Sequence, residues 1–404
     1  MATVSSDLQD QNRAAPAMSP SAEANTNAEW IGEMPWWQWS RATGDWNGIR
    51  PALENNGLTF AGRMLMDWSY VLAGSTEQRG TLRELVDLNL TYDLKPLFKI
   101  DGGTIFAQWY NRQGPRGTDN TRDLQGYDNM DAGRLNQVEE FWYEQKFLGG
   151  RFRTKIGQVD ANNEFDSIGA ASEFINSSAG FSPTLLDFPT YPNPALSING
   201  FVAPVDWFYA GAGAYADNLR DLSGYGFEHP YVLAEAGLKS KPWHRLGPGH
   251  LAAGLWHDTG DVARLDSGMD RSAFGCYLLA EQQIWKCVPG NADDSRGLSV
   301  FAQYGHSDPA VCSIDQQVGL GISALGIVPT RDSDACGIYW TWAKTSRGRT
   351  SAFDENESAL EFFYKWQATP FFVLKPDLQW LQHPGGRAAV DDAWVATLRV
   401  ILIF

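Results

Sequence analysis

The sequence lacks any long apolar run. No segment reaches the roughly 18 consecutive apolar residues that a membrane-spanning helix needs, so no such helix is expected. Residues 1–29 also lack an apolar segment; they are polar, contain proline and show no periodicity, which predicts a disordered leader and no secretory signal. If the protein is exported, we expect its signal to have been removed before Met1.

Positive charge is scarce. The chain has 32 Lys and Arg residues against 48 Asp and Glu residues, a formal net charge of -16. This excess argues against a nucleic-acid partner, because binding to a phosphate backbone requires a basic surface. In a pore, the same charge would favour cations or neutral solutes over anions.

Cysteine is rare and lies only in the last third of the chain. The four residues match no zinc-binding spacing, and they are Cys276, Cys287, Cys312 and Cys336. An even number in one region suggests disulfides formed in an oxidising compartment. Four free thiols are the alternative interpretation.

Recognisable catalytic motifs are missing. None of the six histidines belongs to a Ser/His/Asp, His-Glu-x-x-His or Gly-x-Ser-x-Gly pattern; they are His229, His244, His250, His257, His306 and His383. The sequence therefore predicts no enzyme activity, no cofactor and no metal.

Aromatic residues and glycine are abundant: 17 Trp, 14 Tyr, 21 Phe and 40 Gly. In residues 394–404, alternate positions give one apolar face, formed by Trp394, Ala396, Leu398, Val400, Leu402 and Phe404. Arg399 lies on the opposite face. About ten such residues with aromatic ends predict a transmembrane β-strand, although a buried strand of a soluble sheet has the same pattern.

The rest of the chain decides between these two structures. From residue 58 onward the apolar positions follow period two, the polar faces carry charges in mid-strand, and connections alternate between short and long. This arrangement is typical of an outer-membrane barrel. Counting the strands gives an all-β, antiparallel transmembrane barrel of 16 strands over residues 58–404, with both termini in the periplasm and an aqueous interior.

Two segments stand out from this pattern. Residues 30–57 form a Trp-rich periplasmic segment with one short helix, for which we predict Asp45 as the N-cap, Ile49 and Leu53 on one face, and Gly57 as the C-terminal cap. The longest connection, residues 160–192, is too aromatic to be disordered. We expect it to fold inward and narrow the pore.

Several motifs from about residue 40 to the end resemble the carbohydrate-selective porin (OprB) family. They are GDWNGIR at 44–50, DGGT at 101–104, WYEQKF at 142–147, KIGQ at 155–158, EF at 164–165, FINSS at 174–178, GLSVFAQYG at 297–305, LKPDLQW at 374–380 and PGG at 384–386. The resemblance implies a 16-stranded barrel in the outer membrane of a Gram-negative bacterium. It also implies passive diffusion of glucose and related mono- and oligosaccharides. The cysteines and the polar leader depart from the family pattern.

The expected partners follow from this hypothesis. They are sugars, outer-membrane lipid and lipopolysaccharide, and the barrel assembly machinery. A homo-oligomer and a periplasmic partner for residues 1–40 are both compatible with the sequence. Two other functions are also compatible: a general or cation-preferring diffusion porin, and a structural barrel with a plugged lumen.

The alternation predicts which side chains line the channel. On the strands these are Arg63, Asp67, Asp87, Tyr110, Arg112, Glu140, Trp142, Glu144, Arg153 and Lys155, to which the inward loop adds Asp160, Glu164 and Asp166. Arg153 and Lys155 form a basic row beside the acidic row of Glu140 and Glu144. We interpret the two rows as a sugar-binding constriction; a structural ladder of ion pairs is the alternative. Two loop arginines are secondary candidates, namely Arg116 and Arg122.

Strand direction also suggests how the cysteines would pair. Cys276 and Cys312 are expected at the outer rim, and Cys287 and Cys336 at the periplasmic rim. This predicts the disulfides Cys276–Cys312 and Cys287–Cys336. The second would have to span two intervening strands.

Overall fold

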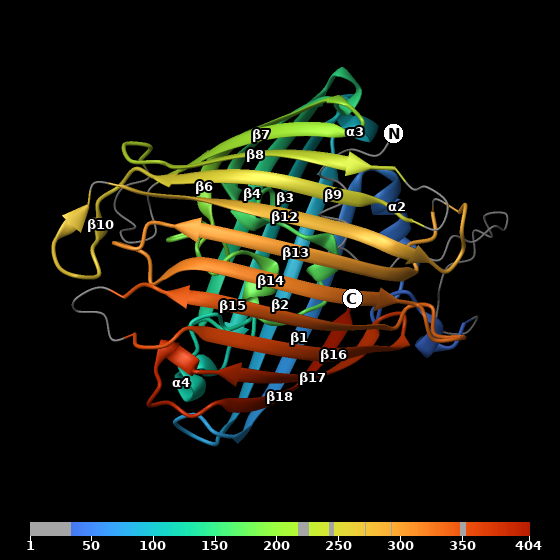
Figure 1. The fold of residues 1–404 in the computed structure, drawn as a ribbon. Coiled ribbons are helices and arrows are strands. Elements are labelled where there is room, and N and C mark those ends of the chain that lie inside the picture. The colour runs from blue at the N-terminus through green and yellow to red at the C-terminus, as the bar shows by residue number, and fades with distance from the viewer. Residues whose placement is uncertain (1–33, 217–225, 242–245, 271, 292, 348–352) are drawn as a thin grey trace.

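A computed structural model of the protein describes residues 34–216, 226–241, 246–270, 272–291, 293–347 and 353–404. Within this part of the chain, sixteen antiparallel strands close into one barrel (Figure 1). The first described segment lies beside the last strand at one end of it, where the Ala42 N–H donates to the Ile403 carbonyl at 2.8 Å. The predicted fold class and strand number are therefore confirmed. The leader, residues 1–29, lies outside the described residues, as do residues 30–33 of the Trp-rich segment.

The barrel strands follow one another in chain order, each pairing with its neighbours. They are β1 (Leu58–Ala73), β2 (Gly80–Asp93), β3 (Gly103–Gln113), β4 (Leu135–Phe147), β5 (Phe152–Val159), β6 (Ala195–Val205), β7 (Phe208–Tyr215), β8 (Tyr231–Ser240), β9 (Gly249–Asp258), β12 (Ala273–Lys286), β13 (Gly297–Ser307), β14 (Ile314–Leu325), β15 (Ala335–Thr345), β16 (Glu357–Thr369), β17 (Phe372–Gln382) and β18 (Ala393–Ile403). A separate hairpin, β10 (Val262–Ala263) and β11 (Met269–Asp270), lies in the long connection between β9 and β12.

Helical segments are short. They are α2 (Ile49–Asn55), α3 (Lys95–Phe98), α4 (Thr118–Thr121) and α5 (Ser177–Gly180), with 3-10 turns η1 (Trp36–Gln38), η2 (Leu148–Gly150), η3 (Ala161–Asn163), η4 (Gly169–Ala171) and η5 (Pro384–Gly386). None of the helices in the described ranges is long and apolar enough to cross a membrane.

The barrel closes between its first and last strands. β18 pairs with β1, as closure of the predicted barrel requires, in an antiparallel register that places Arg399 opposite Asp67. The backbones of Gly62 and Phe404 exchange two hydrogen bonds, of 3.0 and 2.8 Å. A Cβ at Gly62 would lie 2.7 Å from the Phe404 ring, so this glycine leaves room for the ring of the last residue.

The two faces of the wall differ in chemistry. Large apolar side chains are exposed on the outside, including Trp68, Leu255 and Trp394. On β18, Leu398 is exposed, whereas the next residue, Arg399, is buried in the interior. The outward apolar face and inward arginine predicted for this strand are both present. An apolar outer wall around a polar interior is the reverse of a soluble sheet and suits a lipid environment.

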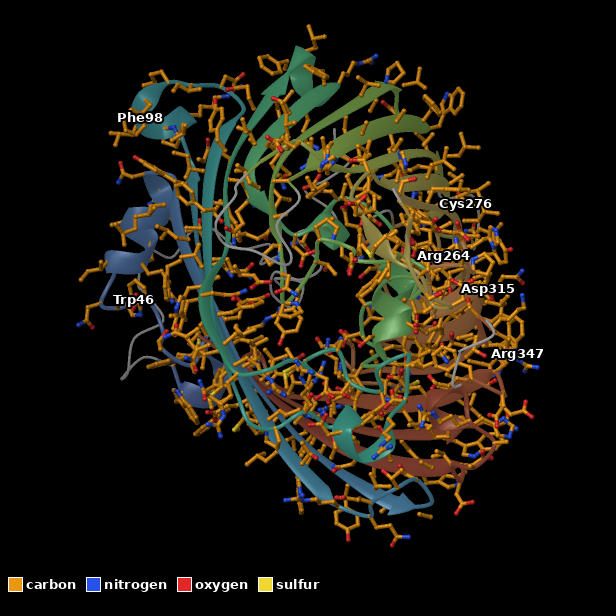
Figure 2. All side chains as sticks on the ribbon, turned by 90° about the vertical axis from the view of Figure 1, so that its left-hand side faces the viewer. Trp46, Phe98, Arg264, Cys276, Asp315 and Arg347 are labelled. Carbon is orange, nitrogen blue, oxygen red and sulfur yellow. The ribbon has the colours of Figure 1, made fainter. Side chains whose placement is uncertain are left out.

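Two long connections fold into the barrel. Figure 2 looks along the barrel and shows loop ribbons inside the ring of strands. In residues 160–192, the Ile175 N–H donates to Glu361 on β16 at 2.6 Å. In the connection from β3 to β4, the Leu124 N–H donates to Glu357 at 2.8 Å. The sequence pattern indicated only the first of these loops.

The short N-terminal helix differs from its prediction. The residue that precedes α2 is Gly48, with φ 83°, and Asp45 instead accepts a hydrogen bond from the Asn47 N–H at 3.0 Å. The predicted N-cap is therefore wrong, because Asp45 closes the turn before the helix. Gly57 follows the last helical turn with φ 91°, the left-handed conformation that favours glycine there. Ile49 is exposed, and the buried helical residue is Arg50.

All four cysteines are free thiols, so neither predicted disulfide is formed. Cys276 alternates with buried residues of β12 and shares the outward face of Phe274, whereas Cys312 is buried in the interior apolar cluster. The two therefore lie on opposite sides of the barrel wall. For Cys287 and Cys336, strands β13 and β14 intervene between their own strands. The prediction used only the rim at which each cysteine lies. That position does not determine whether the thiol is on the inner or the outer face of the barrel wall.

Candidate functional site

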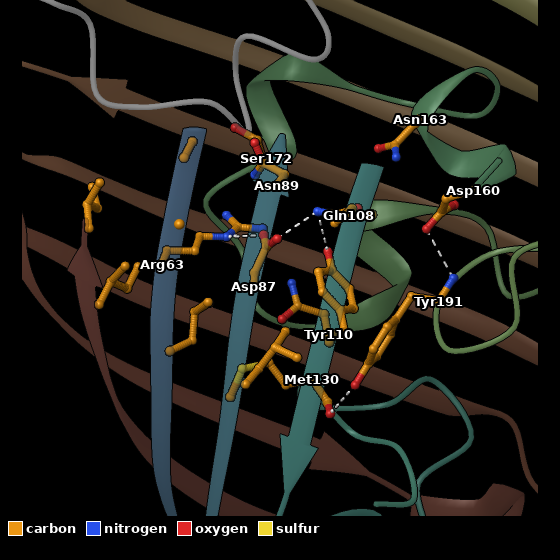
Figure 3. A pocket seen from close by; sticks show the side chains of 18 of the residues that line it. Arg63, Asp87, Asn89, Gln108, Tyr110, Met130, Asp160, Asn163, Ser172 and Tyr191 are labelled. Carbon is orange, nitrogen blue, oxygen red and sulfur yellow. Dashed lines mark hydrogen bonds and ion pairs between the residues drawn. The ribbon is translucent and has the colours of Figure 1, made fainter. Parts of the chain in front are cut away.

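A cavity of about 550 Å³ lies between the wall and the two inward loops (Figure 3). Its wall comes from β1–β4 and β16–β18, the strands on both sides of the closure. It extends to the end of the barrel that carries the termini, where Arg41, Thr59 and Phe404 contribute to it. Its charged lining residues are Arg41, Arg63, Asp87, Asp131, Glu140, Asp160, Glu173, Lys365, Lys375 and Arg399.

A hydrogen-bonded row of side chains crosses β1, β2 and β3 on the cavity wall (Figure 3). Arg63 Nε donates to Asp87 at 2.9 Å, and Gln108 Nε2 donates to the other oxygen of Asp87 at 2.8 Å. Gln108 Nε2 also approaches the Tyr110 hydroxyl at 3.2 Å. These residues, hereafter the polar row, point inward because each occupies the inward parity of its strand. They offer fixed donors and acceptors to a hydroxylated solute.

Glu140, on β4, positions the start of the inward loop. One of its carboxylate oxygens accepts the Asp160 N–H at 2.9 Å, and the other accepts the Asn163 amide at 3.0 Å. Asp160 in turn accepts the Asn162 N–H at 2.9 Å. Burial raises the pKa of Asp160, and the hydrogen bonds that its carboxylate accepts, including the one from Asn162, lower the pKa by less. Glu140 and Asp160 both line the cavity, as predicted from the alternation.

An aromatic surface faces the polar row. Tyr191 comes from the inward loop, and its ring lies edge-on to Tyr110 at 5.8 Å between centroids. The Tyr191 N–H donates to Asp160 at 3.1 Å and its hydroxyl donates to the Met130 carbonyl at 3.1 Å, so both loops hold it (Figure 3). Phe181 also lines the cavity. Aromatic rings can contact the apolar C–H faces of a sugar while the row binds its hydroxyls.

The opposite wall carries two lysines. Lys365 on β16 and Lys375 on β17 both pair with Glu173 of the inward loop, at 2.5 and 3.4 Å. Burial raises the pKa of Glu173, but the two ammonium groups outweigh burial and lower the pKa to about 2. Glu173 is therefore ionised at any physiological pH.

Arg399, from the closing strand, joins the wall to the other inward loop. Its guanidinium contacts Asp67 at 2.6 Å, Asn129 at 2.8 Å and Asp128 at 3.4 Å. Asp67 is fully buried by this arrangement and does not line the cavity. It thus anchors the closure, although the alternation placed it in the channel.

The cavity is electrically balanced. Five cationic and five acidic side chains line it. Carboxylates pair with the cations: Glu54 with Arg41, Asp87 with Arg63, Glu173 with the two lysines, and Asp67 with Arg399. The net charge of -16 is therefore not concentrated in the cavity. A balanced lining suits neutral, polar solutes.

The two rows predicted to form the constriction lie elsewhere, apart from Glu140. Glu144 lies opposite Lys155 in the β4–β5 register, and Glu164 contacts both Lys155 and Arg153, the latter at 2.6 Å. All four side chains are buried beneath the inward loop, and none lines the main cavity. Trp142 is buried with them, 3.9 Å from the Lys155 ammonium. This geometry is that of the alternative interpretation, a structural ladder of ion pairs.

The remaining candidates hold the loops. Arg112 is buried and donates to the carbonyls of Gly114, Pro115 and Met130. Asp166 is buried and accepts the Ser182 N–H at 2.7 Å. The two secondary candidates, Arg116 and Arg122, are exposed and outside the cavity lining.

The lining residues that the sequence pattern missed include Gln108, Glu173, Lys365 and Lys375. A signal existed for the two lysines, since both lie on the polar faces of strands with clear alternation. Only β18 separates β17 from β1, so the presence of these lysines in the same cavity as residues of β1–β3 depends on barrel closure, which joins strands from the two ends of the chain.

Comparison with known proteins agrees with this geometry. Residues 80–404 match the sequence profile of the carbohydrate-selective porin, OprB family. The chain belongs to this family. Porin B of Pseudomonas aeruginosa is 24% identical over 422 aligned positions, which cover 89% of this chain and 90% of that protein. The putative porin QuiX of Acinetobacter baylyi is 23% identical over 415 positions, covering 89% and 92%.

The fold is shared with a solved member of the family. The high-pH structure of Pseudomonas putida OprB superposes with a TM-score of 0.80 at 19% sequence identity, covering 91% of this chain and 99% of that one. Such identity supports the fold alone. Membership of the OprB family makes this protein an outer-membrane channel of the carbohydrate-selective class rather than an enzyme.

Proposed function

We propose that the protein is a passive diffusion channel for glucose and related sugars. The observation that carries this proposal is the polar row of Arg63, Asp87, Gln108 and Tyr110, beside which the aromatic ring of Tyr191 lies in the same cavity lining. Sugars present hydroxyls and apolar C–H faces together, and the cavity offers partners for both. Each contact is weak enough on its own to release the solute, as rapid passage requires.

The charge balance separates this proposal from a cation-preferring porin. A pore that concentrates cations needs unpaired carboxylates along its path. Here each lysine and arginine of the lining has a carboxylate partner, and the lining holds as many cations as acidic residues. Among the described residues, Glu140 and Asp160 form no ion pair but accept hydrogen bonds from backbone and side-chain amides. We therefore expect neutral sugars to pass better than ions of similar size.

Swelling of liposomes that contain the purified protein tests the proposal directly. Glucose should enter several-fold faster than neutral amides of the same size. Gln108→Leu removes both amide donors of the polar row and should abolish most of that preference. Asn111→Leu is the matched control, because it lies on the outward face of the same strand and is outside the cavity lining.

Four results would contradict the proposal. Equal entry of glucose and amides would support a general porin, and a strong preference for cations in bilayer recordings would support the cation-preferring one. Absence of conductance steps would indicate a plugged barrel. Loss of glucose preference in Asn111→Leu as well as Gln108→Leu would show that the polar row is not the selective element.

A further inference from the structure

Exposed apolar side chains gather at the rim that carries the termini. In the turn between β2 and β3, which contains α3, Leu97, Phe98 and Ile100 are 59%, 57% and 42% exposed. Turns that end in water usually carry small and polar residues. A three-residue apolar cluster in so short a turn indicates contact with something other than water.

These residues lie on the outer side of the wall. Phe98 packs edge-on against Tyr92 at 5.8 Å, and Tyr92 shares the outward face of β2 with the exposed Leu90. Trp46, from the N-terminal segment, packs against the outward Phe60 of β1 at 5.5 Å. Figure 2 shows Trp46 and Phe98 outside the ring of strands and on the same side of the barrel. The cluster therefore continues the lipid-facing wall.

Helix α2 extends this surface. Ile49 is 58% exposed, while the helix buries Arg50, whose guanidinium lies 4.2 Å from the Trp46 ring. A helix beside a water-filled mouth would bury its apolar residues and expose its arginine. The inverted arrangement is typical of an element at an apolar boundary.

The charges of the α3 turn fit a phospholipid headgroup layer. Lys95 pairs with Asp101 at 2.7 Å, and Lys99 donates to the Pro96 carbonyl at 2.9 Å. Their alkyl stems can lie along the apolar surface while the ammonium groups stay among the headgroups. With Asp93 and Asp101 in the same turn, the two lysines leave it without a large net charge. Insertion of apolar side chains, rather than attraction to charged lipid, is then the main contribution to membrane binding by this turn.

We infer that Trp46, Ile49, Leu97, Phe98 and Ile100 form a lipid-binding patch, hereafter the rim patch, that inserts into the periplasmic leaflet of the outer membrane. The rim patch binds phospholipid at the boundary between the headgroups and the acyl chains. We assign lipid as the binding partner because the patch is continuous with the apolar outer wall: Phe98 and Trp46 contact wall residues directly. Another exposed aromatic residue, Trp207, lies in the turn between β6 and β7. It is 58% exposed, and its ring centroid lies 6.2 Å from that of Phe208.

Site-directed spin labelling tests the rim patch in the full-length protein. Nitroxide labels are placed at Phe98→Cys and, separately, at Ile49→Cys, in a background whose four native cysteines are replaced. The folded barrels are reconstituted in phosphatidylethanolamine–phosphatidylglycerol vesicles. The collision rates of each label with oxygen, which partitions into lipid, and with a water-soluble nickel chelate are then compared.

Labels at two reference positions give the ratio of oxygen to nickel collision rates expected in lipid and in water. Leu255→Cys lies on the lipid-facing wall at 64% exposure, and Asp119→Cys lies on an exposed part of the β3–β4 connection. We expect the oxygen-to-nickel ratio at positions 98 and 49 to exceed that at 119 several-fold and to approach that at 255. The two labels are introduced in separate variants. If one variant does not fold, the other still tests the inference. A ratio equal to that at position 119 in either folded variant would overturn the inference.

Discussion

Glu173 is the residue on which the neutrality of the cavity most depends. It is one carboxylate between two lysines, and it comes from the inward loop rather than the wall. The other cavity cations have partners on strands or on the N-terminal segment. Replacing Glu173 therefore changes the charge of the lining without removing a contact between two strands.

We expect Glu173→Gln to leave the two lysines without a negative partner and to make the channel prefer anions. The reversal potential in a salt gradient should move toward the anion value, with a several-fold rise in the anion-to-cation permeability ratio. Planar bilayer recordings measure this ratio. Asp119→Asn removes one carboxylate outside the cavity lining and should leave the ratio unchanged; an equal shift in both variants would argue for a general surface-charge effect.

Asp166 illustrates the cost of a buried charge in the inward loop. Burial raises its pKa to about 7, and the Ser182 N–H, which lowers the pKa, only partly offsets this. An acid whose pKa is higher in the folded protein destabilises the fold at any pH above its unfolded-state pKa, because the unfolded chain ionises first. The penalty is small near pH 4, grows as the pH rises toward 7, and stays constant above.

Asp166→Asn should therefore stabilise the protein at pH 8 and have little effect at pH 4. The amide oxygen can still accept the Ser182 N–H, which is 2.7 Å away in the native protein. A shift of about three pKa units sets an upper limit of about 4 kcal/mol on the gain. Urea unfolding in detergent at the two pH values measures it. A gain that is the same at both pH values would show that the pKa of Asp166 does not differ between the folded and the unfolded protein.

At the scale of elements, an aromatic contact fixes the inward loop to the far wall. Phe174 lies 4.8 Å from Phe363, 5.5 Å from Tyr339 and 5.6 Å from Phe301, measured between ring centroids. These partners come from three strands, β13, β15 and β16. Hydrogen bonds from Ile175 and Asn176 to Glu361 hold the adjacent backbone.

Phe174→Ala should loosen this loop and widen the channel. Removing a buried Phe side chain costs about 3–5 kcal/mol, and here the loss falls on the loop rather than on the strand ladder. We expect a larger and noisier single-channel conductance and a smaller preference for glucose. Phe141→Ala is the control, since Phe141 is exposed on the outer face of β4. Unchanged conductance in Phe174→Ala would mean that the loop does not narrow the pore.

At the scale of the whole molecule, the closure and the β3–β4 loop depend on the same buried charge. Arg399 pairs with Asp67 across the seam between β18 and β1, and it also contacts Asp128 and Asn129 of the loop. Breaking a buried ion pair from one side costs about 3–5 kcal/mol, because it leaves a charge without a partner.

Arg399→Met should therefore lower barrel stability markedly. The fraction of heat-modifiable, folded protein on gels and the urea midpoint should both fall. Adding Asp67→Asn should restore part of the loss, because the stranded carboxylate is then removed, while Asp128 keeps the recovery incomplete. If Arg399→Met alone is as stable as the native protein, the Arg399–Asp67 pair does not support closure.

Much of the fold could be predicted because lipid imposes a strict rule on each strand. Every second side chain must be apolar, so the closing strand alone showed its outward face and its inward Arg399. Sixteen such strands and the family motifs specified the barrel. Helix α2 and the cysteines were predicted less well, because neither a capping residue nor the face of an isolated thiol follows from alternation.

The candidate site could be predicted only in part. Alternation correctly selected inward side chains, and Arg63, Asp87, Tyr110, Glu140 and Asp160 do line the cavity. It could not tell which inward residues the loops would cover. Glu144, Arg153, Lys155 and Glu164 were expected at the constriction, but they are buried beneath the loop as ion pairs.

The sequence by itself determined the wall: the number of strands, the direction in which each side chain points and the closure of β18 on β1. These properties are local and repeat every two residues, so they can be read along the chain. Only the tertiary structure decided the lumen. Where the two inward loops lie depends on contacts more than a hundred residues apart, such as those of Glu173 with Lys365 and Lys375. Those contacts convert a chain with a large negative charge into a channel with a balanced lining.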